Sequence, residues 1–186
     1  MIIELDLITA CIKRERKAEY ELYRLTYAHL MSICFRYANS REEAKELLNM
    51  GFIRILYNLE KYKPQIPFKT WSRKVMINVL IDEYRKEKKH HDVIQYIEDY
   101  NETEDYSELN EALIKMNVDQ IHGLITKLPP VSQKVFNLYA IDGYSHKEIA
   151  EMLNMSEGTS KWHVSFSRNE LKEMIQKFIS PLKKVV

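Results

Sequence analysis

One stretch of the chain decides the fold: residues 128–171 read LPPVSQKVFNLYAIDGYSHKEIAEMLNMSEGTSKWHVSFSRNEL. After its Pro-Pro pair, apolar residues recur at helical spacing, and Gly143 ends that helix. Ser145 and Glu148 stand three residues apart, the spacing of a capping box, in which each side chain satisfies a backbone amide at a helix start. The stretch therefore predicts two consecutive helices joined by a turn.

A third helix is predicted directly afterwards. Asn154 suits a short turn because asparagine tolerates a left-handed backbone. Ser156 can cap the next helix, with Glu157 in its positive first turn. Since Ala150 is small, two of these helices can cross closely. A helix held out on such a corner fits the major groove of DNA, so the stretch indicates a helix–turn–helix, with a plain helical bundle as the alternative.

The composition favours an all-α protein. The 186 residues include only 4 glycines and 5 prolines, and 45% of them are hydrophobic. The net charge is +1 at pH 7, so overall charge alone does not indicate a nucleic-acid partner. We expect further helices over residues 5–12, 19–37, 68–89 and 109–125, and one that begins at a Ser40/Glu43 capping pattern and runs through Leu56.

The charges are unevenly placed along the chain. Residues 85–91 are basic, whereas residues 98–111 hold seven acids and no lysine or arginine. Such a stretch is typical of a solvated connector. We therefore predict two small helical domains, residues 1–91 and 111–186, joined by an acidic flexible linker over residues 92–110.

The cysteines and the N-terminus bear on the compartment. Cys11 and Cys34 lie in apolar helical contexts, which indicates a reduced interior rather than a disulfide framework. Residues 1–6 carry two acids and no positive charge of the kind that begins a secretion signal. No apolar run approaches the roughly 18 residues needed to span a bilayer. We expect a cytoplasmic protein without membrane insertion.

A second cluster of polar and aromatic residues lies on the helix predicted over residues 68–89. Positions 71, 74, 78, 82 and 85 fall on one face by three- and four-residue spacing. That face offers an aromatic ring, cations, and an asparagine able to donate and accept hydrogen bonds at a base edge. Single-stranded nucleic acid needs these groups, because cations track phosphates and aromatic faces accept unstacked bases. The alternative is a tryptophan in the core and a solvated, charged helix end.

Three segments in this order resemble the extracytoplasmic-function group of bacterial RNA polymerase sigma factors. Ala44–Leu56 is similar to the family's segment that grips core polymerase. Phe68–Arg85 resembles the reader of the promoter −10 element, and Leu128–Lys161 resembles the reader of the −35 element. The resemblance covers about residues 20–90 and 125–172.

The resemblance implies a promoter-specificity subunit with no catalytic residue, metal or cofactor. Its implied partners are core RNA polymerase, promoter DNA that is single-stranded at −10 and double-stranded at −35, and an anti-sigma factor. Asn78 matches the position beside which a flipped base of the melted strand is captured. The residues implied for core binding are Glu46, Asn49 and Phe52; those for the −10 element are Trp71, Arg73, Lys74, Asn78, Asp82, Arg85 and Lys86; those for the −35 element are Thr159, Lys161, Trp162, Ser165, Phe166 and Arg168.

Four positions depart from the family's pattern. Met50 stands where an acid is usual, and Ser160 stands where a buried valine is usual. Trp162 is bulkier than the usual small residue, and Phe166 replaces a common arginine. An apolar ring can contact a thymine methyl but cannot bind guanine bidentately. The −35 preference of better-known members therefore does not transfer to this chain.

Three other classes of function compete with this interpretation. A free-standing helix–turn–helix regulator would need a dimer face, and no heptad zipper is visible. A helical protein adaptor would leave the Trp71–Arg85 face unexplained. An enzyme is disfavoured because the sequence has no His-Glu-x-x-His, Cys-x-x-Cys or Walker motif, and the adjacent His90 and His91 point in different directions on a helix.

Overall fold

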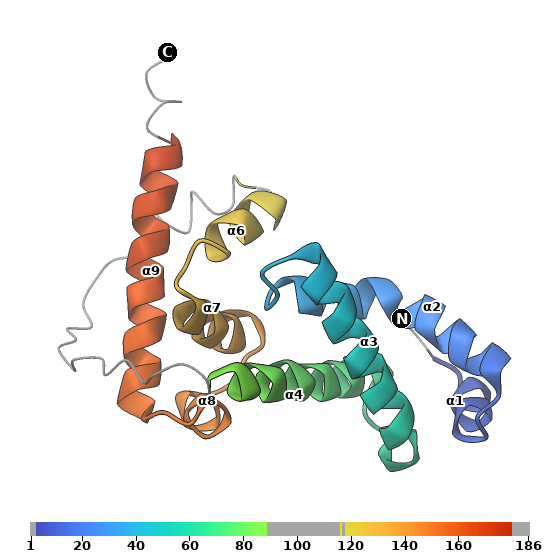
Figure 1. The fold of residues 1–186 in the computed structure, drawn as a ribbon. Coiled ribbons are helices and arrows are strands. Elements are labelled where there is room, and N and C mark those ends of the chain that lie inside the picture. The colour runs from blue at the N-terminus through green and yellow to red at the C-terminus, as the bar shows by residue number, and fades with distance from the viewer. Residues whose placement is uncertain (1–2, 89–115, 117, 180–186) are drawn as a thin grey trace. The chain divides into compact units, whose positions relative to one another are not determined.

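The computed structural model describes residues 3–88, 116 and 118–179, and every regular element in these ranges is helical (Figure 1). The all-α fold class is therefore confirmed. The chain divides into two compact units, Met1–Asp92 and Val93–Val186. Of the helices in the described ranges, none is both long and apolar enough to cross a membrane. The predicted linker over residues 92–110 and the His90-His91 pair lie outside the described residues.

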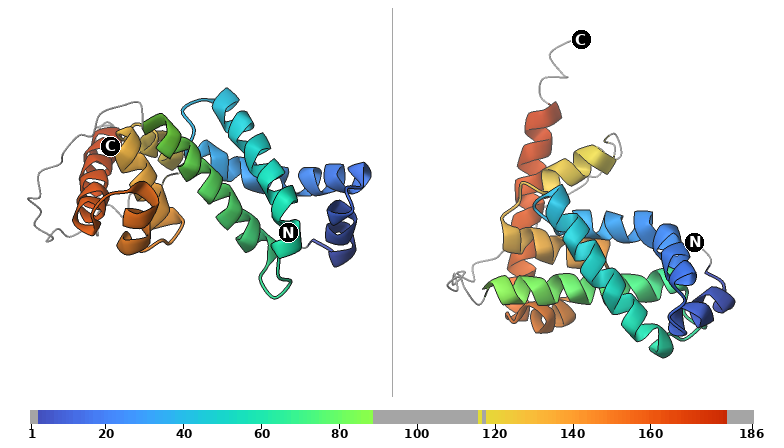
Figure 2. Two further views of the ribbon diagram at one scale, coloured as in Figure 1. Left: turned by 60° about the horizontal axis from the view of Figure 1, so that its bottom comes forward. Right: turned by 45° about the vertical axis from the view of Figure 1, so that its right-hand side comes forward.

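The first unit is a set of packed helices. Its elements are α1 (Leu5–Ile12), α2 (Arg16–Phe35), α3 (Arg41–Asn58), a short 3₁₀ helix η1 (Leu59–Lys61) and α4 (Phe68–Lys88). Helix α3 packs against both α2 and α4, and α2 also contacts α1 and α4 (Figures 1 and 2). The largest fully buried side chains come from α2, α3, η1 and α4: Leu22, Leu30, Ile33, Leu48, Ile55, Leu59, Met76 and Ile77.

The α3–α4 contact depends on a glycine. At Gly51, an added Cβ would lie 2.3 Å from Sδ and 2.4 Å from Cε of Met76, whose side chain is fully buried. Helix α3 begins as the sequence predicts, since Oγ of Ser40 accepts a hydrogen bond from the Glu43 amide at 3.0 Å. The Glu43 carboxylate, however, accepts from the Asn39 amide at 2.6 Å, one residue earlier than in a regular capping box.

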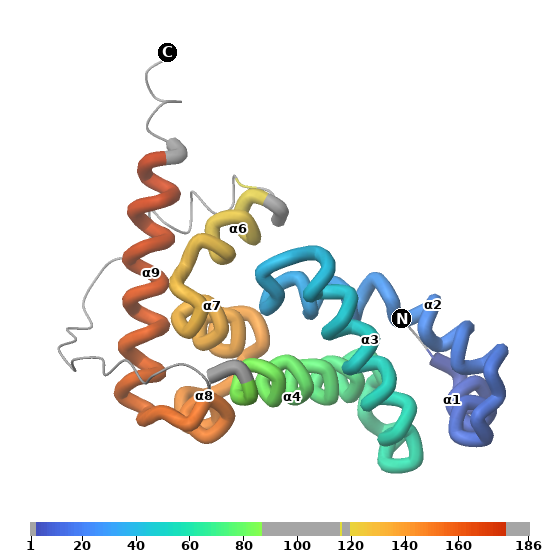
Figure 3. The backbone as a smooth tube through the Cα atoms, in the orientation of Figure 1, coloured from blue at the N-terminus to red at the C-terminus, as the bar shows by residue number. Residues whose placement is uncertain are grey.

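The second unit holds the predicted helix–turn–helix. Its elements are α6 (Val118–Ile125), α7 (Pro130–Phe136), a π-helical turn η2 (Asn137–Ile141), α8 (His146–Leu153) and α9 (Glu157–Ile179). Helix α9 contacts α6, α7 and α8, and the backbone tube shows α8 leading through a tight turn into α9 (Figure 3). One core cluster joins α6 to α9 through Leu124, Ile125, Leu128, Leu171 and Ile175.

The turns of this unit follow the chemistry of their residues. Gly143 has φ +77°, a left-handed conformation that favours glycine. Ser145 and Glu148 form the complete capping box at the start of α8, and Asn154 ends that helix with φ 52° and ψ 59°. Oγ of Ser156 then accepts from the Thr159 amide at 2.9 Å to cap α9. Among the turns of the described residues, the π-helical turn η2 before Gly143 was not predicted.

Candidate nucleic-acid and polymerase interface

Helix α4 presents the predicted polar face. Lys74, Asn78, Asp82 and Arg85 are exposed along it, at spacings of three and four residues. Trp71, one turn before Lys74, is only partly exposed. The structure therefore offers cations, a carboxylate and an amide on one continuous face, with an indole ring at its N-terminal end.

The partly exposed Trp71 is held by an aromatic cluster that the sequence analysis missed. Its ring centroid lies 5.2 Å from that of Tyr62 and 5.4 Å from that of Phe68, and the Tyr62 and Phe68 rings meet edge-on at 5.3 Å. The Tyr62 hydroxyl donates to the Ile66 carbonyl at 2.8 Å, which fixes the loop before α4. Trp71 thus combines both sequence interpretations, because one part of the ring is packed and the other is accessible.

The start of α4 is also tied to α2. The His29 Nε2 lies 3.2 Å from the Lys69 carbonyl oxygen. Burial lowers the pKa of His29, and the nearby cations Lys69, Arg73 and Arg36 lower it further, against the opposing effect of this hydrogen bond. The imidazole is therefore neutral at pH 7, since its ordinary pKa is 6.5.

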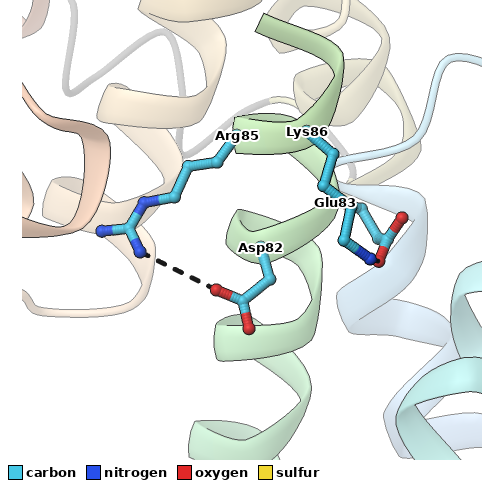
Figure 4. Close-up of polar contacts among 4 residues, drawn as sticks. All are labelled: Asp82, Glu83, Arg85 and Lys86. Carbon is cyan, nitrogen blue, oxygen red and sulfur yellow. Dashed lines mark hydrogen bonds and ion pairs between the residues drawn. The ribbon is translucent and has the colours of Figure 1, made fainter. Parts of the chain in front are cut away.

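A groove of about 380 Å³ lies where α4 runs past α3. Within it, the Arg85 guanidinium lies 3.8 Å from the Asp82 carboxylate, and the Lys86 ammonium contacts the Glu83 carboxylate at 2.5 Å (Figure 4). Because exposed ion pairs contribute little net stability, these cations can exchange a carboxylate for a phosphate at low cost. Two further lining residues, Met50 and Arg54, come from α3 and were not predicted as site residues.

The exposed face of α3 carries two of the three residues predicted to bind polymerase. Glu46 and Asn49 are exposed, and the Tyr23 hydroxyl donates to Oδ1 of Asn49 at 3.5 Å. Phe52, in contrast, is 8% exposed, and its ring packs edge-on against Tyr23 at 5.0 Å. The ring is enclosed between α2 and α3 and has little surface available to a partner in this structure, and the role of Phe52 in core binding stays a prediction.

An apolar stripe on α3 was not predicted. Met50, Ile53 and Tyr57 are 41%, 53% and 67% exposed, and their spacing of three and four residues places them on one face. Exposed large apolar side chains in a row are typical of a contact surface. The sequence signal was present as helical spacing, but spacing alone did not distinguish this stripe from the core-facing one.

Helix α9 presents most of the residues that are predicted to contact the −35 element. Lys161 is exposed, while Thr159, Trp162 and Phe166 are partly exposed. The amide of Thr159, one of the residues implied for the −35 element, donates to Oγ of Ser156. Ser165 is 2% exposed, so its hydroxyl is not presented at the surface of this structure, and its role at the −35 element stays a prediction.

Two other polar side chains on α9 contact residues inside the second unit. The Arg168 guanidinium lies 5.9 Å from the centre of the Tyr139 ring, a cation–π contact. Ser160 is fully buried, and its Oγ lies 3.0 Å from Nδ1 of His146. This hydrogen bond compensates for burying a hydroxyl where the family usually has a valine.

Comparison with known proteins supports the same interpretation. The Sigma-70 region 2 model matches residues 22–90, and the Sigma-70 region 4 model matches residues 119–171. The chain is 26% identical over 155 residues to the ECF RNA polymerase sigma factor SigW of Bacillus subtilis, covering 79% of this chain and 83% of SigW. The chain belongs to the extracytoplasmic-function group of sigma factors.

Other relatives of this sigma factor agree. It is 25% identical over 177 residues to the RNA polymerase sigma factor YlaC of Bacillus subtilis, covering 88% of this chain and 95% of YlaC. Among solved structures, the sigma factor RpoE of Bartonella quintana, in complex with the anti-sigma factor NepR, has a TM-score of 0.51 at 15% identity, covering 84% of this chain and 96% of RpoE. That structural likeness shows the fold.

The two matches assign the two units. Region 2 of this sigma factor spans α2 to α4, and region 4 spans α6 to most of α9. The protein is an RNA polymerase sigma factor, which binds core polymerase and directs promoter-specific initiation. The presence of region 2 disfavours the alternative of a free-standing regulator, which needs no polymerase-binding segment.

Proposed function

We propose that the two units of this sigma factor have different roles in initiation. Residues 1–91 bind core polymerase and read and melt the −10 element, while residues 111–186 read the −35 element and residues 92–110 link them. Like the initiation factors of its family, it carries no catalytic chemistry of its own. We place its action in the cytoplasm, where its polymerase and DNA partners meet. The observation that carries the proposal is the face of α4, Lys74 to Arg85, beside the groove shared with α3.

Core polymerase would dock on the exposed face of α3. Ile53 and Tyr57 supply apolar area, and Glu46 and Asn49 supply polar contacts at its edge. An apolar strip with a few polar groups suits docking against another helix. Phe52 supports this surface from beneath by packing α3 on α2.

The exposed face of α4 would hold the melted −10 strand. Extruding a base costs a few kcal/mol, so hydrogen bonds from the Asn78 amide and stacking on the accessible part of Trp71 would help to keep the strand open. Arg85 and Lys86 would exchange Asp82 and Glu83 for backbone phosphates. Lys74 and Arg73 would extend this phosphate path toward the start of α4.

Region 4 would dock α9 in the major groove at −35. Lys161 supplies an exposed cation for a phosphate, and the partly exposed Trp162 and Phe166 face the bases. Arg168 stays near Tyr139 and would reach a phosphate only by leaving that ring.

An anti-sigma protein is the second proposed partner. The support is that the related RpoE was solved in complex with the anti-sigma factor NepR. Such a protein would cover the α3 and α4 faces and keep the factor silent. Affinity capture from the native cell should recover it, and a sigma factor that is fully active with no captured inhibitor would contradict this part.

The test is co-elution of the full chain with bacterial core RNA polymerase on a sizing column. We expect a stable complex that a known sigma factor displaces. Glu46→Lys and Ile53→Asp should weaken it, whereas Glu60→Ala, an exposed change in η1, serves as the matched control. DNA binding without any co-elution would overturn the proposal.

A further inference from the structure

Two aromatic rings on α9 are stacked on one another. Trp162 and Phe166 lie one helical turn apart, with ring centroids 5.0 Å apart and planes inclined by only 12°. Most of the buried residues of α9 lie on the side that packs into its unit, namely Ser160, His163, Val164, Ser167, Leu171 and Ile175, while Ser165 is buried away from that side. At about 100° per residue, Trp162 lies roughly 170° and Phe166 roughly 130° from the centre of that side. We call this pair the aromatic plate.

The aromatic plate is fixed from beneath. The Trp162 ring meets the edge of the His163 ring at a centroid distance of 5.0 Å and an angle of 79°. His163 is fully buried, and its Nδ1 lies 2.9 Å from Oγ of Ser132 on α7. The Ser167 hydroxyl donates to the His163 carbonyl at 2.7 Å. A surface held in this way loses little conformational freedom when it binds.

The chemistry of the aromatic plate selects one kind of group in a DNA major groove. Phenylalanine has no hydrogen-bonding atom, and the tryptophan ring has one N–H donor and no acceptor. The C5-methyl of thymine is the apolar group that base pairs present in that groove. The exposed Lys161 beside the plate supplies a cation for the phosphate that would fix the register.

Resting on the proposed function, we propose that the aromatic plate reads the methyl groups of two neighbouring thymines in the −35 element. The 5.0 Å between the ring centroids falls between one and two base-pair rises of about 3.4 Å. Because the rings are stacked, each offers a separate edge, and the two edges can meet methyl groups on adjacent base pairs. His163 and Ser132 act as positioning residues, since they touch the plate or its support and not the DNA.

The experiment uses the full chain assembled with core RNA polymerase. Promoters selected from a random DNA pool should carry two neighbouring thymines in the −35 element. Replacing each of them with deoxyuridine removes only the methyl group and should weaken binding about 4-fold, the factor expected for burying one methyl group, and about 15-fold for the pair. Deoxyuridine in the spacer is the matched DNA control and should change nothing.

Two protein variants distinguish the aromatic plate from its neighbour. In Phe166→Ala the penalty for deoxyuridine should shrink toward that of one methyl group. In Lys161→Ala the penalty should persist while the salt dependence of binding becomes shallower by about one unit. Far-UV circular dichroism of each variant checks that α9 is intact.

Each remaining outcome contradicts the inference. Selected elements without neighbouring thymines, or thymines that tolerate deoxyuridine, would overturn it while leaving the sigma function in place. If Phe166→Ala abolished binding of a protein partner but left promoter binding unchanged, the aromatic plate would be a protein-binding surface and not a DNA-binding one. Failure to form any holoenzyme or select any promoter would overturn the proposed function, and this inference with it.

Discussion

Gly51→Ala tests the close approach of α3 and α4, which carry the polymerase-binding and −10 faces. Alanine in place of glycine inside a helix is worth about 1 kcal/mol through backbone propensity. Here, however, the new methyl would lie 2.3 Å from Sδ of the fully buried Met76, whose sulfur is also 3.6 Å from Sγ of Cys34. Overpacking of this kind costs about 1–3 kcal/mol, so we expect a net loss of about 1 kcal/mol in the free energy of unfolding of the first unit.

The sign should reverse when Met76 is shortened. Met76→Ala alone should cost about 2–5 kcal/mol because it leaves a cavity. In that background, Gly51→Ala should stabilise the unit by about 1 kcal/mol, since the clash is gone and the propensity gain remains. The coupling between the two sites should therefore be about 2 kcal/mol.

The assay exploits the two tryptophans of the chain, because Trp71 lies in the first unit and Trp162 in the second. In a Trp162→Phe background, thermal melts followed by fluorescence report the first unit alone. A loss of 1 kcal/mol should lower its melting temperature by about 4–8 °C. Gly123→Ala, monitored through Trp162 in a Trp71→Phe background, is the matched control, because no atom lies within 4 Å of an added Cβ there. Gly51→Ala that stabilises the otherwise unchanged first unit would refute this reasoning.

Four further outcomes are expected. Ser145→Ala should cost about 1 kcal/mol in the stability of the second unit by removing the cap of α8, measured by urea melts; an unchanged midpoint would contradict the capping geometry. Burial raises the pKa of Cys11 from 9.0 to about 11 and that of Cys34 from 9.0 to about 12, so neither thiol should react with a disulfide reagent at pH 8 until the unit unfolds. Because the unfolded thiols ionise first, the first unit should lose stability as pH rises from about 9 to about 12, and a flat pH profile would argue against this assignment. Asn78→Ala should impair promoter melting, monitored by permanganate reactivity of unpaired thymines, more than it impairs core binding. Equal losses of promoter melting and core binding would contradict the assignment of Asn78 to the −10 site.

The helix caps and turns could be predicted from the sequence because each depends on residues that are close together along the chain. The Ser145–Glu148 box, the left-handed Asn154 and the Ser156 cap each involve residues within a few positions of one another, and all appear in the structure. The exposed face from Lys74 to Arg85 could be predicted for the same reason, since helical spacing fixes which side chains share a face.

What a side chain packs against was decided by tertiary structure alone. Phe52 and Ser165 were each grouped with exposed residues of the same helix as candidate contacts, yet both side chains are buried. Burial depends on packing against segments that are distant in sequence. Likewise, spacing places Trp162 and Phe166 on one side of α9, but only the contact of His163 with Ser132, 31 residues earlier, shows how the aromatic plate is supported. The sequence alone thus determined the helices, their caps and the family, whereas the folded chain determined which of the matching residues can reach a partner.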